Sequence, residues 1–314
     1  MRYSGSRLLV IMARGPWLFA LVVAVSFSCR HSPAVSQGRI KAPLVEGDIK
    51  DLSFEDPSWA NAPETPIALG PQQIALPKLE KAGPRVLHVR ALCNGVWVSF
   101  YLSWDDPTQD RLAAIGSFSD SVAIQFPSAS TPLPEAAMGG PPGNARTVVI
   151  HQWKAVWQEM SEGRLKGIKT FYPDTWNDLY IFEQLREGSK EEMEKTYTTS
   201  VAAGNPLAHT GAPVRDVVAQ GFGSLEISPE QTSRGRGTWK QGRWSVVISR
   251  PLVRESSELA TDRLQYAAFA VWDGSCGEVG ARKMVSDWVP IEFVRTAAAE
   301  HRKGGAVKER EKGK

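Results

Sequence analysis

Met138 is the side chain in this sequence that most invites a chemical interpretation. It stands in a loop rich in proline, glycine and alanine, directly before Gly139-Gly140-Pro141-Pro142-Gly143. A thioether in such a loop has two uses: it can fill a gap in the packing, or it can ligate a soft metal such as haem iron. From the loop alone, gap-filling is the simpler interpretation, and the rest of the chain must decide between the two.

The common catalytic motifs are absent from the sequence. There is no Gly-x-Gly-x-x-Gly opening a helix, no Walker loop, no Gly-x-Ser-x-Gly and no His-Glu-x-x-His. The acidic pair Asp105-Asp106 stands where a strand is expected to end, so turn geometry explains it better than acid–base catalysis. The histidines that could ligate a metal are dispersed: His88, His151, His209 and His301. These absences favour a binding or electron-transfer protein over an enzyme.

Met138 must be positioned by the two apolar runs on either side of its loop. Val122, Ile124 and Phe126 alternate with smaller or polar residues, which predicts a strand that Pro127 ends. Residues 147–150 form the second run and lead into a segment with His151, Trp153, Lys154 and Trp157.

Further strands are expected on both sides of this region. Residues 85–104 read as a hairpin around Asn94-Gly95, a dipeptide preferred in two-residue turns. A second hairpin turns at Gln241-Gly242, and strands are predicted over residues 266–272 and 288–293. Short strands separated by turn signals, with a few short helices and long loops, predict a mainly β protein with an antiparallel β-sandwich.

The N-terminus has the pattern of an export signal. Arg2, Arg7 and Arg14 precede an apolar run over residues 17–27, which is too short for a comfortable transmembrane helix. Two endings fit: Cys29 as a lipid-anchored residue of a lipoprotein, or Ala34-Val35-Ser36 as a signal-peptidase site. Export into the periplasm is expected in either case.

The chain therefore divides into four expected parts. Residues 1–36 are the signal and the start of a linker, 37–50 the rest of the linker, 51–296 the folded domain, and 297–314 a disordered basic tail. The formal net charge of +3 gives no reason to expect nucleic-acid binding. Cys93 and Cys276 remain in the domain, either as a disulfide or as two thiols. No Cys-x-x-Cys-His motif for covalent haem attachment is present.

Several segments in order resemble the haem b subunit of type II dimethyl sulfoxide reductase-family molybdoenzymes, of which the gamma subunit of ethylbenzene dehydrogenase is the best-known. Besides the Met138 region these segments are WDDPT at 104–108, AAGNP at 202–206, AQGFGSLE at 219–226, GRWSVVISRPL at 242–252 and AFAVWDGSCGEVGARKMVSDW at 268–288. The resemblance covers roughly residues 50–295. It implies a sandwich related to carbohydrate-binding modules that holds one non-covalent haem b between a methionine and a lysine.

The resemblance places the methionine ligand at Met138 and the lysine ligand at Lys283, with Lys154 as the second choice. His151 is a rival ligand because it lies near Met138 in the sequence. Lysine ligates only when neutral, and neutralising a lysine of ordinary pKa at pH 7 costs about 4–5 kcal/mol. Burial in an apolar pocket offsets part of that cost.

The resemblance also implies a non-catalytic role in a complex. The subunit would relay electrons between the iron–sulfur subunit of a periplasmic molybdenum enzyme, with its molybdopterin catalytic subunit, and a cytochrome or quinol. Two alternatives remain open. One is a carbohydrate-binding module with Trp97, Trp153 or Trp244 as its sugar platform, and the other is a haem-based sensor lipoprotein without a molybdenum partner.

Overall fold

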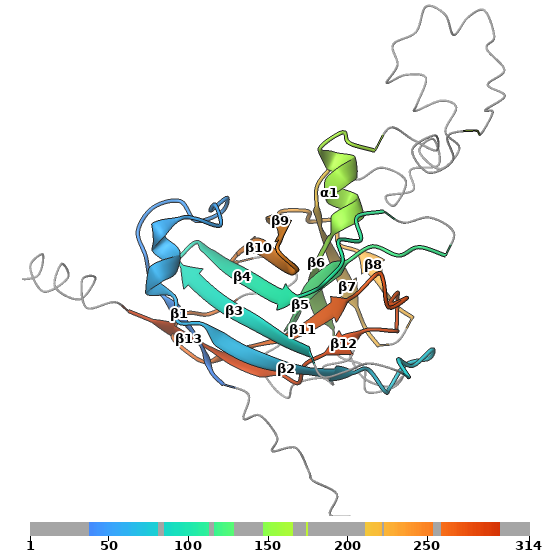
Figure 1. The fold of residues 1–314 in the computed structure, drawn as a ribbon. Helices are drawn as coiled ribbons and strands as arrows, with labels where there is room; N and C mark the ends of the chain where they lie inside the picture. The colour runs from blue at the N-terminus through green and yellow to red at the C-terminus, as the bar shows by residue number, and fades with distance from the viewer. Residues whose placement is uncertain are drawn as a thin grey trace, which may run out of the picture. The chain divides into compact units, whose positions relative to one another are not determined.

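The chain folds into two layers of mainly antiparallel strands (Figure 1). The computed structural model describes residues 38–80, 85–112, 116–128, 147–165, 174, 211–221, 223–253 and 259–295. The elements are β1 (Ile40–Pro43), the 3-10 helix η1 (Pro57–Asn61), β2 (Thr65–Pro71), β3 (Arg85–Cys93), β4 (Trp97–Asp105), β5 (Ser121–Pro127), β6 (Val148–Lys154), α1 (Ala155–Ser161), β7 (Val214–Ala219), β8 (Glu226–Ile227), β9 (Arg234–Lys240), β10 (Arg243–Pro251), β11 (Gln265–Trp272), β12 (Met284–Val285) and β13 (Val289–Val294).

The strand pairing separates the two layers. One has the order β2-β3-β4-β10-β9, and the other has the order β8-β7-β6-β5-β11. Short β12 pairs with both β11 and β2 and so joins the layers at one edge. β13 pairs antiparallel with β11 and parallel with β1. The predicted antiparallel β-sandwich is confirmed.

Aromatic side chains fill the space between the layers. The ring centroids of Phe100 on β4 and Phe126 on β5 lie 5.9 Å apart, and those of Trp153 on β6 and Trp244 on β10 lie 5.0 Å apart. All four side chains are buried, as expected where the inner faces of two sheets interdigitate. The predicted sugar platform is therefore wrong for Trp153 and Trp244, which are 0% and 2% exposed. Trp97 is half-buried and packs against a neighbouring apolar cluster.

Local sequence signals placed the hairpins correctly. Between β3 and β4 the Asn94 side chain accepts hydrogen bonds from the N–H groups of Val96 and Trp97, and Gly95 has a φ of 84°. Gln241 and Gly242 also have positive φ in the turn between β9 and β10. The outer face of β4 is covered by the chain itself, because Tyr101 packs edge-on against Phe54 and Trp59.

Several sequence predictions fall outside the described residues. These are the export signal with Cys29, the basic tail after residue 296 and the proposed ligand Met138. Among the described cysteines, Cys93 is buried and Cys276 is exposed, and both are free thiols rather than partners in a disulfide. No helix in the described part of the chain is long and apolar enough to cross a membrane.

The packing of β9 against β6 gives a test of the sandwich. A Cβ atom added at Gly237 would lie 2.3 Å from the indole of buried Trp153, whereas one added at Gly70 on β2 would meet nothing within 4 Å. We expect Gly237→Ala to lower the free energy of unfolding by about 1–3 kcal/mol through overpacking. Gly70→Ala should change it by less than about 1 kcal/mol. Chemical denaturation measures both, and equal losses would contradict the packing described.

Candidate ligand-binding cavity

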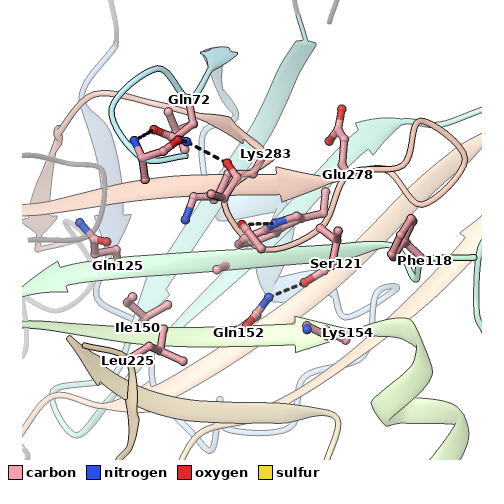
Figure 2. A pocket seen from close by; sticks show the side chains of 18 of the residues that line it. Gln72, Phe118, Ser121, Gln125, Ile150, Gln152, Lys154, Leu225, Glu278 and Lys283 are labelled. Atoms are coloured by element: carbon pink, nitrogen blue, oxygen red, sulfur yellow. Dashed lines mark hydrogen bonds between the residues drawn. The ribbon is translucent and has the colours of Figure 1, made fainter. Parts of the chain in front are cut away.

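A cavity of about 880 Å³ lies against β5, β6 and β11. Its volume is in the range of sites that enclose a drug-sized molecule or cofactor. The lining is mostly apolar and includes Ile150, Trp157 and Trp272, with polar groups at intervals. Figure 2 shows the labelled lining residues projecting from several strands toward a common space.

Strand alternation sends one face of β5 and β6 into the core and the other into this cavity. On β5, Val122, Ile124 and Phe126 belong to the core, while Ser121, Ala123 and Gln125 line the cavity. On β6, Trp153 belongs to the core, and Ile150, Gln152 and Lys154 line the cavity. Because successive side chains of a strand point to opposite faces, the core packing fixes which side chains a ligand can reach.

Lys283, the lysine that the family resemblance singled out, lines this cavity immediately before β12. Its side chain is only 4% exposed, and its ammonium nitrogen lies 5.2 Å from the centroid of the Trp272 ring. No ion pair of the described residues includes it. Burial lowers the pKa of Lys283 from 10.5 to about 8, because an apolar site disfavours the ammonium form.

Gln72 holds the backbone around Lys283 and was not identified from the sequence. The N–H of Gln72 donates to the carbonyl of Lys283 at 3.0 Å. Its side-chain amide donates to the carbonyls of Ala281 at 2.9 Å and Ala75 at 2.8 Å. Gln72 is 2% exposed and so ties the segment after β2 to the segment that carries Lys283 (Figure 2). Nothing in its sequence neighbourhood signals this role, since the two segments meet only in the folded chain.

Lys154, the second-choice lysine, lines the same cavity from the end of β6. Its nitrogen lies 4.6 Å from the centroid of the Trp157 ring. Burial lowers the pKa of Lys154, and the nearby charge of Arg215 lowers it further. Lys154 ends β6 and Lys283 precedes β12, and β5 and β11 lie between these two strands in the sheet order (Figure 2). The structure thus brings both lysines to one cavity.

The two ends of the Met138 loop are described, although Met138 itself is not. The loop joins β5 to β6, and Pro127 is paired with Val148 across these strands. The next residues continue the contact, because the N–H of Ser128 donates to the carbonyl of Thr147 at 3.0 Å. The loop therefore starts and ends beside the two strands that supply one wall of the cavity.

His151, the rival ligand, lies on the other face of β6. It is fully buried, and its Nδ1 atom lies 2.6 Å from a carboxylate oxygen of Asp216 and 2.9 Å from the Ser233 hydroxyl. Its ring packs against Phe126 in the core, with 5.6 Å between centroids. The alternation that takes Lys154 to the cavity takes His151 away from it, so the interpretation of His151 as a ligand for this cavity is wrong.

A group of buried carboxylates was missed by sequence reasoning. Oxygens of Asp106, Asp120 and Asp273 lie within 4.8 Å of one another. Asp106 does form the expected turn, accepting a hydrogen bond from the N–H of Thr108 at 3.1 Å, but it is only 1% exposed. Burial raises the pKa of Asp120 to about 7. Arg85 offsets part of the negative charge by pairing with Asp273 and Glu278, each at 3.0 Å.

Comparison with known proteins identifies the family. The model of the ethylbenzene dehydrogenase family matches residues 56–284, and the chain belongs to this family. A relative from Haloferax mediterranei is 24% identical over 281 residues, which cover 88% of this chain and 80% of the relative. That protein is described as a putative respiratory nitrate reductase heme subunit.

Solved structures of low similarity come from carbohydrate-binding modules of family 9. One from Caldicellulosiruptor kristjanssonii in complex with glucose has a TM-score of 0.40 and 9% identity, over 83% of this chain and 97% of that one. The same organism's module in complex with cellotriose has a TM-score of 0.38 and 7% identity, over 83% and 95% of the two chains.

The lowered pKa of Lys283 predicts that the wild-type chain and the Lys283→Met variant differ in stability by an amount that depends on pH, when no ligand is bound. Between pH 8 and 10.5 the unfolded chain binds more protons than the folded chain, so the folded protein gains stability as the pH rises. Lys283→Met should therefore stabilise the ligand-free protein by up to about 3 kcal/mol below pH 8. This advantage should shrink as the pH rises toward 10.5. Denaturant unfolding at several pH values measures it.

Lys41→Met is the matched control, because Lys41 is exposed on β1. The quantity to compare is the difference in the free energy of unfolding between the two variants at each pH. An advantage of Lys283→Met that is the same at every pH would contradict the burial of a chargeable lysine.

Arg85 gives a second test, directed at the buried carboxylates. Arg85→Met leaves Asp273 and Glu278 without their cation, and we expect a loss of about 3–5 kcal/mol in the free energy of unfolding. Arg243→Met removes a surface pair with Asp105 at 2.7 Å and should cost no more than about 1 kcal/mol. Thermal or denaturant unfolding near pH 7 compares the two, and similar losses would show that the buried carboxylates do not depend on Arg85.

Proposed function

We propose that this chain binds one haem b in the cavity, with Lys283 and Met138 as axial ligands, and that it serves as an electron-transfer subunit. The observation that carries the proposal is Lys283, a lysine buried in an apolar cavity without an ion-pair partner among the described residues. Membership of the ethylbenzene dehydrogenase family and the heme-subunit relative support the same conclusion.

The site lowers the cost of making lysine a ligand. A lysine with a pKa of about 8 is neutralised at pH 7 for about 1.4 kcal/mol, whereas an ordinary lysine requires about 4–5 kcal/mol. The hydrogen bonds of Gln72 hold the backbone on both sides of Lys283, which limits the positions that its nitrogen can take. The lining of the cavity is mostly apolar, which favours the neutral amine over the ammonium form.

Met138 reaches the same cavity in this proposal from the loop between β5 and β6. A haem with methionine and lysine on its two axial positions supplies one-electron transfer rather than substrate activation, since no coordination site stays open. The protein groups then have three tasks: they hold the cofactor, keep water out and set its potential. A non-catalytic role follows.

The partners follow from the same family. We propose a heterotrimer with a molybdopterin catalytic subunit and an iron–sulfur subunit, in which this chain exchanges electrons with a cytochrome or quinol. The N-terminal signal would export it to the periplasm, with Cys29 as a lipid anchor if the lipoprotein ending is used. The relative described as part of a respiratory reductase supports a complex of this kind.

Absorbance spectroscopy of the purified full chain after reconstitution with haem tests the proposal. The wild-type protein should show a Soret band and the low-spin spectrum of a six-coordinate haem. Lys283→Ala and Met138→Ala should each convert the spectrum toward a five-coordinate form, because each removes one axial ligand.

Lys154→Met is the matched control on the same cavity, and it should retain the six-coordinate spectrum. A spectrum that changes in Lys154→Met and not in Lys283→Ala would assign the lysine ligand to Lys154. The absence of any haem binding by the wild-type chain would overturn the proposed function.

A further inference from the structure

Two cations contact the same indole, that of Trp157, which lines the cavity. The guanidinium carbon of Arg215 lies 4.7 Å from the centroid of the Trp157 ring, and the nitrogen of Lys154 lies 4.6 Å from the same centroid. Both contacts are of the cation–π kind, which holds a cation against an aromatic face. Trp157 and Lys154 line the cavity.

The sheet register places Arg215 on the cavity face of β7. Arg215 is paired with Gln152, which lines the cavity, and its neighbour Asp216 is paired with His151, which faces the core. Side chains paired across neighbouring strands point to the same face. Val217, two residues further along β7, packs with Ile150 and Trp272 on this same face.

Arg215 is a buried cation without an ion-pair partner, and without a hydrogen-bond acceptor for its terminal nitrogens, among the described residues. It is 6% exposed, and both of its terminal nitrogens, Nη1 and Nη2, lack a hydrogen-bond acceptor. No ion pair within the described part of the chain includes Arg215 or Lys154. The acidic residue that lines the cavity, Glu278, is paired with Arg85. A buried guanidinium with unpaired N–H groups is unfavourable, because it has lost its water and gained no acceptor in return.

The two cations also repel each other in the ligand-free protein. The charge of Arg215 contributes to the lowered pKa of Lys154, after the larger effect of burial. An anion between or beside them would remove both penalties, since it accepts hydrogen bonds from the guanidinium and neutralises the pair. A planar carboxylate is the best match, because arginine binds it through two parallel N–H groups.

We infer that Arg215 and Lys154 form the anion-binding end of the cavity and bind the carboxylates of its ligand. This inference rests on the proposed function, and it assigns Arg215 and Lys154 to the propionate groups of haem b. Lys283 then binds at the iron, and Arg215 with Lys154 fixes the direction in which the haem enters. Lys154, the second choice for the iron ligand, is thereby assigned to the carboxylates of the ligand instead.

A comparison of haem with its dimethyl ester tests this inference, because esterification removes both carboxylate charges and leaves the ring and iron unchanged. The purified full chain is titrated with each compound, and affinities are obtained from the Soret absorbance. The wild-type protein should bind haem about ten- to a hundredfold more tightly than the diester, the range expected for charge-assisted hydrogen bonds.

Arg215→Gln and Lys154→Gln should each weaken haem binding and reduce the preference over the diester, and the double variant should lose it. Arg215→Lys keeps the charge and should retain part of the preference, which guards against a simple packing defect. Arg243→Gln is the matched control, since this arginine pairs with Asp105 on the protein surface. In every variant that binds haem the Soret position should stay that of the wild type, because neither residue contacts the iron.

The outcomes separate the two proposals. Equal affinity of the wild-type chain for haem and the diester, with a normal six-coordinate spectrum, would overturn the anion site and leave the proposed function standing. A preference for haem over the diester that persists in the double variant would also overturn the anion site and leave the proposed function standing. Failure of the wild-type chain to bind either compound would overturn both.

Discussion

The structure depends on one constraint, the two-residue period of β5 and β6 in a sheet that is buried on both faces. One set of side chains must pack against the opposite layer, and the alternating set is then committed to the cavity. Phe126 and Trp153 belong to the first set, and Gln125 and Lys154 belong to the second. A shift of register by one residue would place the polar set in the core, so the aromatic packing between the layers also positions the ligand site.

The cavity departs from the usual composition of a protein interior. It is lined by two lysines, Lys154 and Lys283, among apolar and aromatic walls, and its acidic lining residue, Glu278, is paired with Arg85. Buried charges are tolerated only when they are paired, neutralised or bound to something else. Arg85 satisfies the first condition with Asp273 and Glu278, and His151 is held by Asp216 in the core. Lys283 approaches the second condition, whereas the terminal nitrogens of Arg215 have no acceptor among the described residues.

This imbalance is the physical reason to regard the site as built for a ligand. A sandwich evolved only for stability would fill such a cavity with apolar side chains, because uncompensated cations lower the free energy of unfolding. In the function that we propose, the ligand would bring an electron-pair acceptor to the amine of Lys283 and an anion to Arg215 and Lys154. A haem would carry both groups on one rigid ring.

The sequence by itself determined the two hairpins, the central strands β5, β6 and β11, and the family, but it did not predict β1, β2 or β7. Local signals were sufficient there, since alternation defines a strand and Asn94-Gly95 or Gln241-Gly242 defines a turn within a few residues. The ordered motifs also singled out Lys283. Tertiary structure alone decided what covers each face of β5, because the sequence shows an apolar face and a face of small and polar residues but does not say what packs on either. It buried Trp153 and Trp244, turned His151 toward Asp216, and brought Gln72 and Lys283 from distant segments to one cavity. Contacts between residues that are far apart in the chain carry no local pattern, so only the folded sheet could show them.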